Sequence, residues 1–450
     1  MFPLHDKTRR RICLAGFFLL CVVPTVLVAG WCIVRCRPGR VAAEAQRLSR
    51  ELGLDVSLDD VQYPQPGVIR YVGLELTDPE TGCTMLQCRT LLAQRTEVAD
   101  RQEQPKETLL LTVAEPIVEA AALDRVGQWL HRMLALPVGR TPLDVRLVAS
   151  EVVLLPGETP SQEERLREFG GGVQSFAGGS QAWANFRIAG RDALEPIRVR
   201  MVRGRGDSQP TVGFELDTGG AVVPCRALAW GWPALEPLGP QSGFSGRIRA
   251  SRVAAGTTHS GWDGEIRGEF TAVDLGCLVS ERFPHQLTGI AEVTIDRARF
   301  RQGRLEEVAG TLSVGPGEMS RSLWEAAVTS LQLQPPVQAV ASGDPIPFEQ
   351  LALTYVLDSQ GLTLQGRCPA APPGTILVDR YGRFLGEPAG PLPVAALLQT
   401  LVPTGEVRVP ATRQTDWLMR YLPVPSATVA APSESPLSDA RFGLRGGGGR

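Results

Sequence analysis

The feature that most constrains this chain is an uncharged apolar run near its start. No charged residue occurs from Ile12 to Val34, a run of 23 residues. As a helix rising about 1.5 Å per residue, the run would reach about 34 Å, which is enough to cross a hydrocarbon core about 30 Å thick. Pro24 lies inside it, and transmembrane helices tolerate proline where neighbouring groups satisfy the freed carbonyl. The run predicts a transmembrane helix over residues 12–34.

A cleaved signal peptide is the alternative interpretation of this run. Signal peptides have apolar cores of about 7–15 residues, and this run is longer, although Val28 and Gly30 would permit cleavage after Gly30. A lipoprotein is disfavoured because Trp31 precedes Cys32, where lipidation needs a small residue. The length of the run favours a retained anchor.

Charges on the two sides of the run give its orientation. Four basic residues precede it within residues 1–11, and three arginines follow it within residues 35–40. Positive charge favours the cytoplasmic side, and a large following domain is translocated largely regardless of its charge. We therefore expect a cytoplasmic N-terminus, with residues 41–450 exported.

Composition narrows the class of the exported part. The chain of 450 residues has a formal net charge of −2, whereas nucleic-acid-binding domains are basic, so no nucleic-acid partner is expected. The 48 glycines and 36 prolines are more than an average protein contains but fewer than low-complexity chains have. The exported part is therefore predicted to be folded and rich in turns.

Hydrophobic periodicity gives the fold class. Helical spacing predicts a juxtamembrane helix that starts near Val41 and ends at Gly53. Apolar and polar residues alternate in many later segments, which is typical of antiparallel strands with one apolar face: 54–58, 68–76, 197–201, 212–216, 266–270, 291–295 and 351–357. Further helices are predicted over 123–136, 319–331, 394–402 and 416–422, too few to supply βαβ crossovers. The predicted class is mainly β with added helices (α+β), its one-sided apolar sheets antiparallel.

Stretches rich in Gly, Ser or Pro predict the domain boundaries. They divide the chain into a basic cytoplasmic head (1–11), the transmembrane helix (12–34), a juxtamembrane helix with a first β unit (41–157), a Gly/Ser-rich linker (158–180), a second β unit (181–333), a Pro-rich linker (334–347), a third β and helical unit (348–422) and a disordered tail (423–450).

Motifs of enzymes are missing from the sequence. Only Lys7 and Lys106 exist, and neither follows glycine as a phosphate-binding loop requires. The four histidines are scattered and none forms a zinc-binding pattern. We therefore predict no enzymatic activity, no catalytic residue, no cofactor and no metal. A hydrolase that uses a pair of carboxylates is a distant alternative. For the cysteines, two interpretations stay open: a Cys83–Cys88 disulfide, or free thiols buried in the core.

Several strings of this sequence resemble AsmA-like envelope proteins, the superfamily that includes TamB. They are Leu52-Gly53-Leu54-Asp55-Val56, Pro66-Gly67-Val68-Ile69 and Gly73-Leu74-Glu75-Leu76 after the anchor, and Gly264-Glu265-Ile266-Arg267-Gly268, Leu287-Thr288-Gly289 and Gly310-Thr311-Leu312 later. The resemblance covers residues 1–80 and 243–333. It implies a bacterial inner-membrane protein whose periplasmic sheet curls into an open apolar groove that handles lipid or supports outer-membrane biogenesis. It implies no catalytic residues.

The groove hypothesis names six residues as its apolar lining: Ile266, Phe270, Val293, Ile295, Leu312 and Val314. Membrane lipids would be the partners. Alternation alone does not distinguish a face covered by acyl chains from one covered by another sheet, because burial contributes about 25 cal/mol per Å² in either case. The alternative function is therefore a membrane-anchored, non-enzymatic scaffold whose closed β domains bind other envelope proteins.

Overall fold

A computed structural model describes most of the chain. It leaves out residues 1–5, 36–38, 99–105, 136–143, 156–162, 177, 192, 194, 206–209, 230–232, 254–261, 337–343 and 403–450. The helix expected over 416–422 and the tail expected over 423–450 lie outside the described residues.

One apolar helical segment leads into the fold, made of α1 (Asp6–Phe17), a π-helical turn η1 (Phe18–Val22) and α2 (Val23–Arg35). Its 21 residues Arg10–Gly30 are long and apolar enough to span a membrane, and no part of this stretch is buried in the protein. The π-helical turn ends two residues before Pro24, and the Thr25 hydroxyl donates a hydrogen bond of 2.6 Å to the Cys21 carbonyl. This local adjustment accommodates the proline without breaking the helix.

The strands that the structure describes all belong to one 21-stranded sheet. In its first half lie β1 (Asp55–Ser57), β2 (Asp60–Gln65), β3 (Val68–Thr77), β4 (Thr84–Val98), β5 (Lys106–Ala114), β6 (Ile117–Glu119), β7 (Asp144–Leu155), β8 (Glu164–Phe176), β9 (Gly179–Ile188), β10 (Ile197–Arg205) and β11 (Pro210–Asp217). In its second half lie β12 (Val223–Pro224), β13 (Gly243–Val253), β14 (Asp263–Asp274), β15 (Ile290–Arg301), β16 (Arg304–Val314), β17 (Gly317–Met319), β18 (Ile346–Asp358), β19 (Gly361–Gly366), β20 (Thr375–Asp379) and β21 (Phe384–Gly386).

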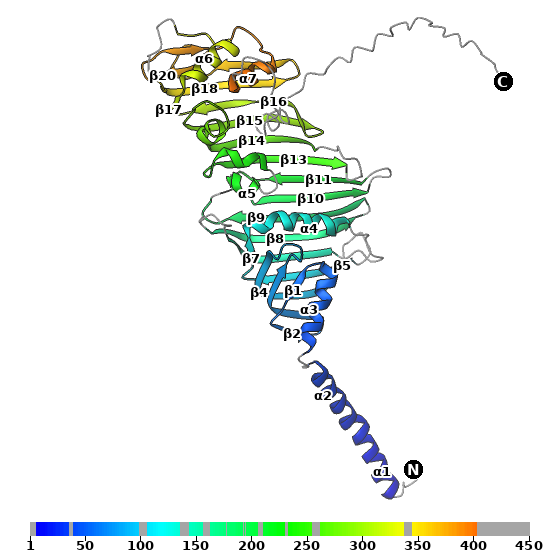
Figure 1. Ribbon diagram of the computed structural model, residues 1–450. Helices are drawn as coiled ribbons and strands as arrows, with labels where there is room; N and C mark the ends of the chain where they lie inside the picture. Colours follow the sequence, from blue (N-terminus) through cyan, green and yellow to red (C-terminus); the bar gives the residue numbers. More distant parts are fainter. Residues whose placement is uncertain are drawn as a thin grey trace, which may run out of the picture.

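Sixteen of these strands form one uninterrupted ladder. Each pairs with the next in the order β2-β3-β4-β5-β7-β8-β9-β10-β11-β13-β14-β15-β16-β18-β20-β21. At about 4.8 Å between strands, the ladder is about 70 Å long. β1 and β2 lie at the end next to α2, and β20 lies at the opposite end (Figure 1).

The remaining helices lie before, between and after the strands along the chain. They are α3 (Gly39–Leu52), η2 (Ala120–Ala122), α4 (Leu123–Ala135), α5 (Cys225–Ala229), η3 (Pro233–Leu238), the π-helix η4 (Gly276–Ser280), α6 (Arg321–Ser330) and α7 (Val394–Leu401). The mainly β class with added helices is confirmed. Gly53 ends α3 as predicted: its φ is +65° and its N–H donates a 2.9 Å hydrogen bond to the Ser49 carbonyl.

The predicted linker over 158–180 is wrong for Glu164–Phe176, which forms β8 between β7 and β9. Glycines there suggested a loop, but they lie in the ladder, where neighbouring groups come close to them. A Cβ atom at Gly172 would clash with the Val145 carbonyl oxygen and would lie only 3.2 Å from the indole nitrogen of Trp183. Strand glycines often mark such close approaches.

The predicted division into separate β units is also wrong, because hydrogen-bonded pairing continues across both expected linkers. β16 pairs directly with β18 across residues 334–347, and β18 already begins at Ile346. A loop rich in proline can connect strands that are neighbours in one sheet just as it can connect domains, so composition alone does not distinguish the two.

One junction in the ladder is parallel, whereas antiparallel pairing was expected throughout. β5 runs parallel to β7, and α4 lies between them in the chain. Parallel neighbours require a crossover connection, and α4 belongs to it. The prediction that helices would supply no βαβ crossover is therefore wrong at this position.

Candidate functional site

A row of apolar residues follows the strand pairing across thirteen strands, from β3 to β18. In this central apolar row each residue is the direct register partner of the next: Ile69, Ala93, Leu111, Leu147, Gly171, Ala184, Val199, Leu216, Ile248, Ile266, Ala298, Val308 and Leu357. Since side chains alternate between faces along each strand, the row defines one continuous apolar face of the sheet.

A second row runs beside the first on the same face, two residues away along each strand except β16, where a register shift makes the offset three. This lateral apolar row contains Leu109, Val145, Val173, Ala182, Met201, Phe214, Ala250, Gly264, Phe300 and Leu305. Apart from Ala182 and Ala250, its members are only half-buried. The face therefore leaves parts of large apolar side chains such as Met201 and Phe214 accessible.

The covering of this face differs from that of a β-sandwich. Because the described strands form one sheet, no second sheet among them packs over the apolar rows. α4 packs against β9 and β4, and α3 packs against β1 and β2. Coverage varies along the central apolar row. Leu216 and Ile248 are buried, whereas their neighbours in the row, Val199 and Ile266, are half-buried.

All six residues predicted as groove lining lie on this apolar face. Phe270, Val293 and Leu312 are successive register partners on β14, β15 and β16. Ile266 belongs to the central apolar row, and the remaining two are paired on the same face: Ile295 with Gly268 and Gly310, and Val314 with Ala291.

The six residues differ in accessibility. Phe270 and Val314 are buried, and the Phe270 ring packs on that of Phe244 with 4.9 Å between ring centroids. The other four are half-buried: Ile266, Val293, Ile295 and Leu312. Of the six, only these four leave side-chain surface accessible, whereas Phe270 and Val314 belong to the core. The predicted lining named no residue from β4 to β11. In this half, 197–201 and 212–216 were predicted as one-sided strands, and the alternation of Leu109, Leu111 and Val113 was a further usable signal.

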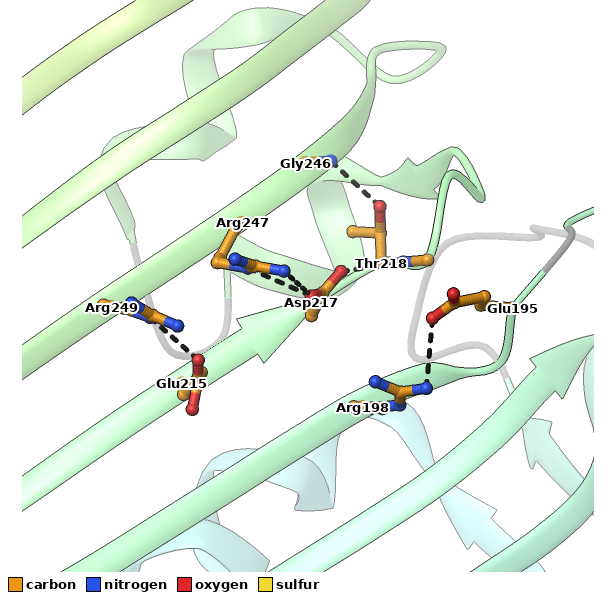
Figure 2. Close-up of polar contacts among 9 residues, drawn as sticks. Glu195, Arg198, Glu215, Asp217, Thr218, Gly246, Arg247 and Arg249 are labelled. Carbon is orange, nitrogen blue, oxygen red and sulfur yellow. Dashed lines mark hydrogen bonds and ion pairs between the residues drawn. The ribbon is translucent and has the colours of Figure 1, made fainter.

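The opposite face of the sheet carries a row of alternating charge. Its register partners are Arg200, Glu215, Arg249, Glu265, Arg299 and Glu307, one on each strand from β10 to β16 in the ladder. Figure 2 shows part of this surface: Arg249 Nε lies 2.8 Å from Glu215 and Arg247 Nε lies 3.0 Å from Asp217. Opposite charges directly across strands favour this register, and a slip of one residue would expose the apolar rows while burying the charges.

The cysteines are thiols rather than disulfides at the described positions. Cys83 and Cys88 are both free, so the bridge considered from the sequence is not formed. Cys88, Cys225 and Cys368 are buried, and burial raises the pKa of the Cys88 thiol to about 11. They act as small apolar residues of the core.

His285 is the buried histidine of the C-terminal half. It is 2% exposed, and its Nδ1 lies 2.9 Å from the Ser322 hydroxyl, which lies 3.0 Å from the Ser320 hydroxyl at the N-cap of α6. Burial lowers the pKa of His285, so the folded state favours the neutral ring.

This histidine predicts a loss of stability in mild acid. Below pH about 6.5 the unfolded chain binds a proton that folded His285 does not, so the free energy of unfolding should fall as the pH drops from about 6.5. Thermal unfolding of the full chain between neutral and mildly acid pH should show this fall, and His285→Gln should make it smaller. An identical pH dependence in wild type and variant would contradict the assignment.

Comparisons of the chain with protein-family models, with curated proteins and with solved structures gave no significant match.

Proposed function

We propose that this chain is a single-pass, AsmA-like protein of the bacterial inner membrane that moves phospholipid along the apolar face of its periplasmic sheet, in support of outer-membrane biogenesis. The observation that carries the proposal is the central apolar row, which crosses thirteen strands without a polar residue. The row starts at the end of the ladder beside α3 and the apolar helix α1–α2 (Figure 1).

The physical basis is burial of acyl chains on half-buried side chains. Each methylene group removed from water contributes about 0.8 kcal/mol. An acyl chain lying across several strands would cover side chains of both rows, such as Val199, Met201 and Phe214, which the fold leaves half-buried. The interaction is non-directional, so a lipid can shift from one strand to the next without breaking specific bonds.

The length and continuity of the ladder support transport rather than storage. A ladder of about 70 Å is longer than an extended phospholipid, and its pairing has no gap between β2 and β21. The paired charges of the opposite face keep that surface in water. A lipid would therefore have one continuous apolar path that begins near the anchored end.

The test is lipid transfer by the full-length chain reconstituted in donor vesicles. A fluorescent phospholipid in these vesicles should reach acceptor vesicles faster than it does from protein-free donors. Heat-denatured chain in the same vesicles is the control for leakage. If native and denatured chains give the same rate, the transfer proposal fails, and protein crosslinking would then test the alternative of a scaffold for envelope proteins.

A further inference from the structure

One edge of the apolar face carries two arginines that have no carboxylate partner among the described residues. Beyond the lateral apolar row, the register partners on β9, β10, β11 and β13 are Ser180, Arg203, Val212 and Arg252. The Arg252 guanidinium lies over the Trp262 ring, with 4.7 Å between its central carbon and the ring centroid. We call Arg203, Arg252 and Trp262 the edge cluster.

α4 brings a third basic group to this edge. The Ser180 hydroxyl donates a 3.1 Å hydrogen bond to the Leu134 carbonyl, which places the last turn of α4 beside Arg203. His131 lies one turn earlier on the same helix. Burial lowers the pKa of His131, and the positive charges of Arg252 and Arg203 act in the same direction.

The two edge arginines differ from those on the opposite face. Arg247 and Arg249 of the same strand β13 are paired with Asp217 and Glu215. Within the described ranges, no carboxylate lies within ion-pair distance of Arg203 or Arg252, and the Arg252 guanidinium lies over the Trp262 ring. These two half-buried arginines lie next to an accessible apolar surface. Together the two features are complementary to an amphipathic molecule with a negatively charged head group and an apolar tail.

We propose that the edge cluster and His131 bind the head group of a phospholipid with net negative charge while its acyl chains lie on the two apolar rows. This inference rests on the proposed function. Arginine forks match phosphate oxygens and form charge-assisted hydrogen bonds with them. Stacking on Trp262 holds the Arg252 guanidinium in place before a ligand arrives.

The distances along the strands fit an amphipathic ligand. Arg203 lies four residues from Val199, and Arg252 lies four residues from Ile248. At about 3.3 Å per residue, each guanidinium-bearing residue is about 13 Å from the central apolar row. A phosphate at the edge would therefore leave the acyl chains above Met201, Phe214 and the central row. The competing explanation is that the arginine stems merely cover apolar surface with their heads in water, which predicts no preference among head groups.

The experiment compares head groups in the vesicle-transfer assay with the full-length chain. Labelled phosphatidylglycerol, which is anionic, and labelled phosphatidylcholine, which is zwitterionic, carry the same acyl chains. Wild type should transfer phosphatidylglycerol about tenfold faster, a difference of about 1.4 kcal/mol. Both lipids present a phosphate to the arginines, but only phosphatidylcholine also brings a trimethylammonium group, which the arginines repel. Arg203→Gln with Arg252→Gln should remove this preference and leave phosphatidylcholine transfer unchanged.

The matched control is Arg198→Gln with Arg249→Gln, which removes the same charge from β10 and β13 on the opposite face and should keep the preference. Equal transfer of both lipids by wild type would overturn the head-group site while leaving lipid transfer intact, and transfer of neither lipid would overturn the proposed function itself. Competition by soluble glycerol phosphate as effective as that by vesicle phosphatidylglycerol would show a free-phosphate site and overturn the assignment to lipid.

Discussion

Ile295→Asp is expected to slow phospholipid transfer by about tenfold or more. Ile295 lies on the apolar face between two glycines, Gly268 and Gly310, and is half-buried. An acyl chain that passes this point would have to desolvate the new carboxylate, and burying an unpaired charge costs several kcal/mol. Because the side chain is not fully buried, the loss of folding stability should be only about 1–3 kcal/mol. The vesicle assay measures the first effect, and thermal unfolding measures the second.

Thr311→Asp is the matched control for this variant. Thr311 is equally half-buried but lies on the opposite face, with Thr294 and Thr354 as its register partners. Transfer by this variant should equal that of wild type. If both aspartate variants slow transfer to the same extent, or if neither does, the apolar face is not the path of the lipid.

Phe244→Ala is expected to lower the free energy of unfolding by about 3–5 kcal/mol. The Phe244 side chain is fully buried on β13 and packs on Phe270, so its removal leaves a cavity in the covered part of the apolar face. Urea unfolding of the full-length chain in detergent, followed by tryptophan fluorescence, should show the shift of the transition.

Phe176→Ala removes the same ring from the end of β8, where it is 46% exposed. This control should change the free energy of unfolding by less than about 1 kcal/mol. A small effect at Phe244, equal to that at Phe176, would mean that the region around Phe244 and Phe270 is not a packed core.

The sequence predicted the local structure well because local patterns determine it. Alternation located strands such as β10, β11 and β15, and helical spacing with a terminal glycine located α3. It also placed the six lining residues on one face, because side-chain direction follows from parity along a strand. The sequence did not predict which lining residues are buried. Phe270 is buried against Phe244, whereas Ile295 is half-buried between two glycines, and this difference depends on the residues of neighbouring strands.

Long-range pairing escaped prediction for a physical reason. Whether β16 pairs with β18 depends on contacts between residues far apart in the chain, and a proline-rich stretch is compatible with either a linker or a connection within a sheet. The parallel β5–β7 junction escaped for the same reason. The edge cluster was equally hidden, because Arg203 and Arg252 become neighbours only through the register of β10, β11 and β13.

The most direct measurement is a photocrosslinking scan along the ladder in cells that express the full-length chain. A photoreactive residue would replace Leu111, Val199, Ile266 or Leu353 on the apolar face, and Arg198, Arg267 or Thr311 on the opposite face. Mass spectrometry would then identify adducts. One continuous lipid path predicts phospholipid adducts at all four apolar positions and at none of the opposite ones. Adducts confined to Leu111, the position closest to the N-terminal end of the ladder, or found equally on both faces, would contradict the account.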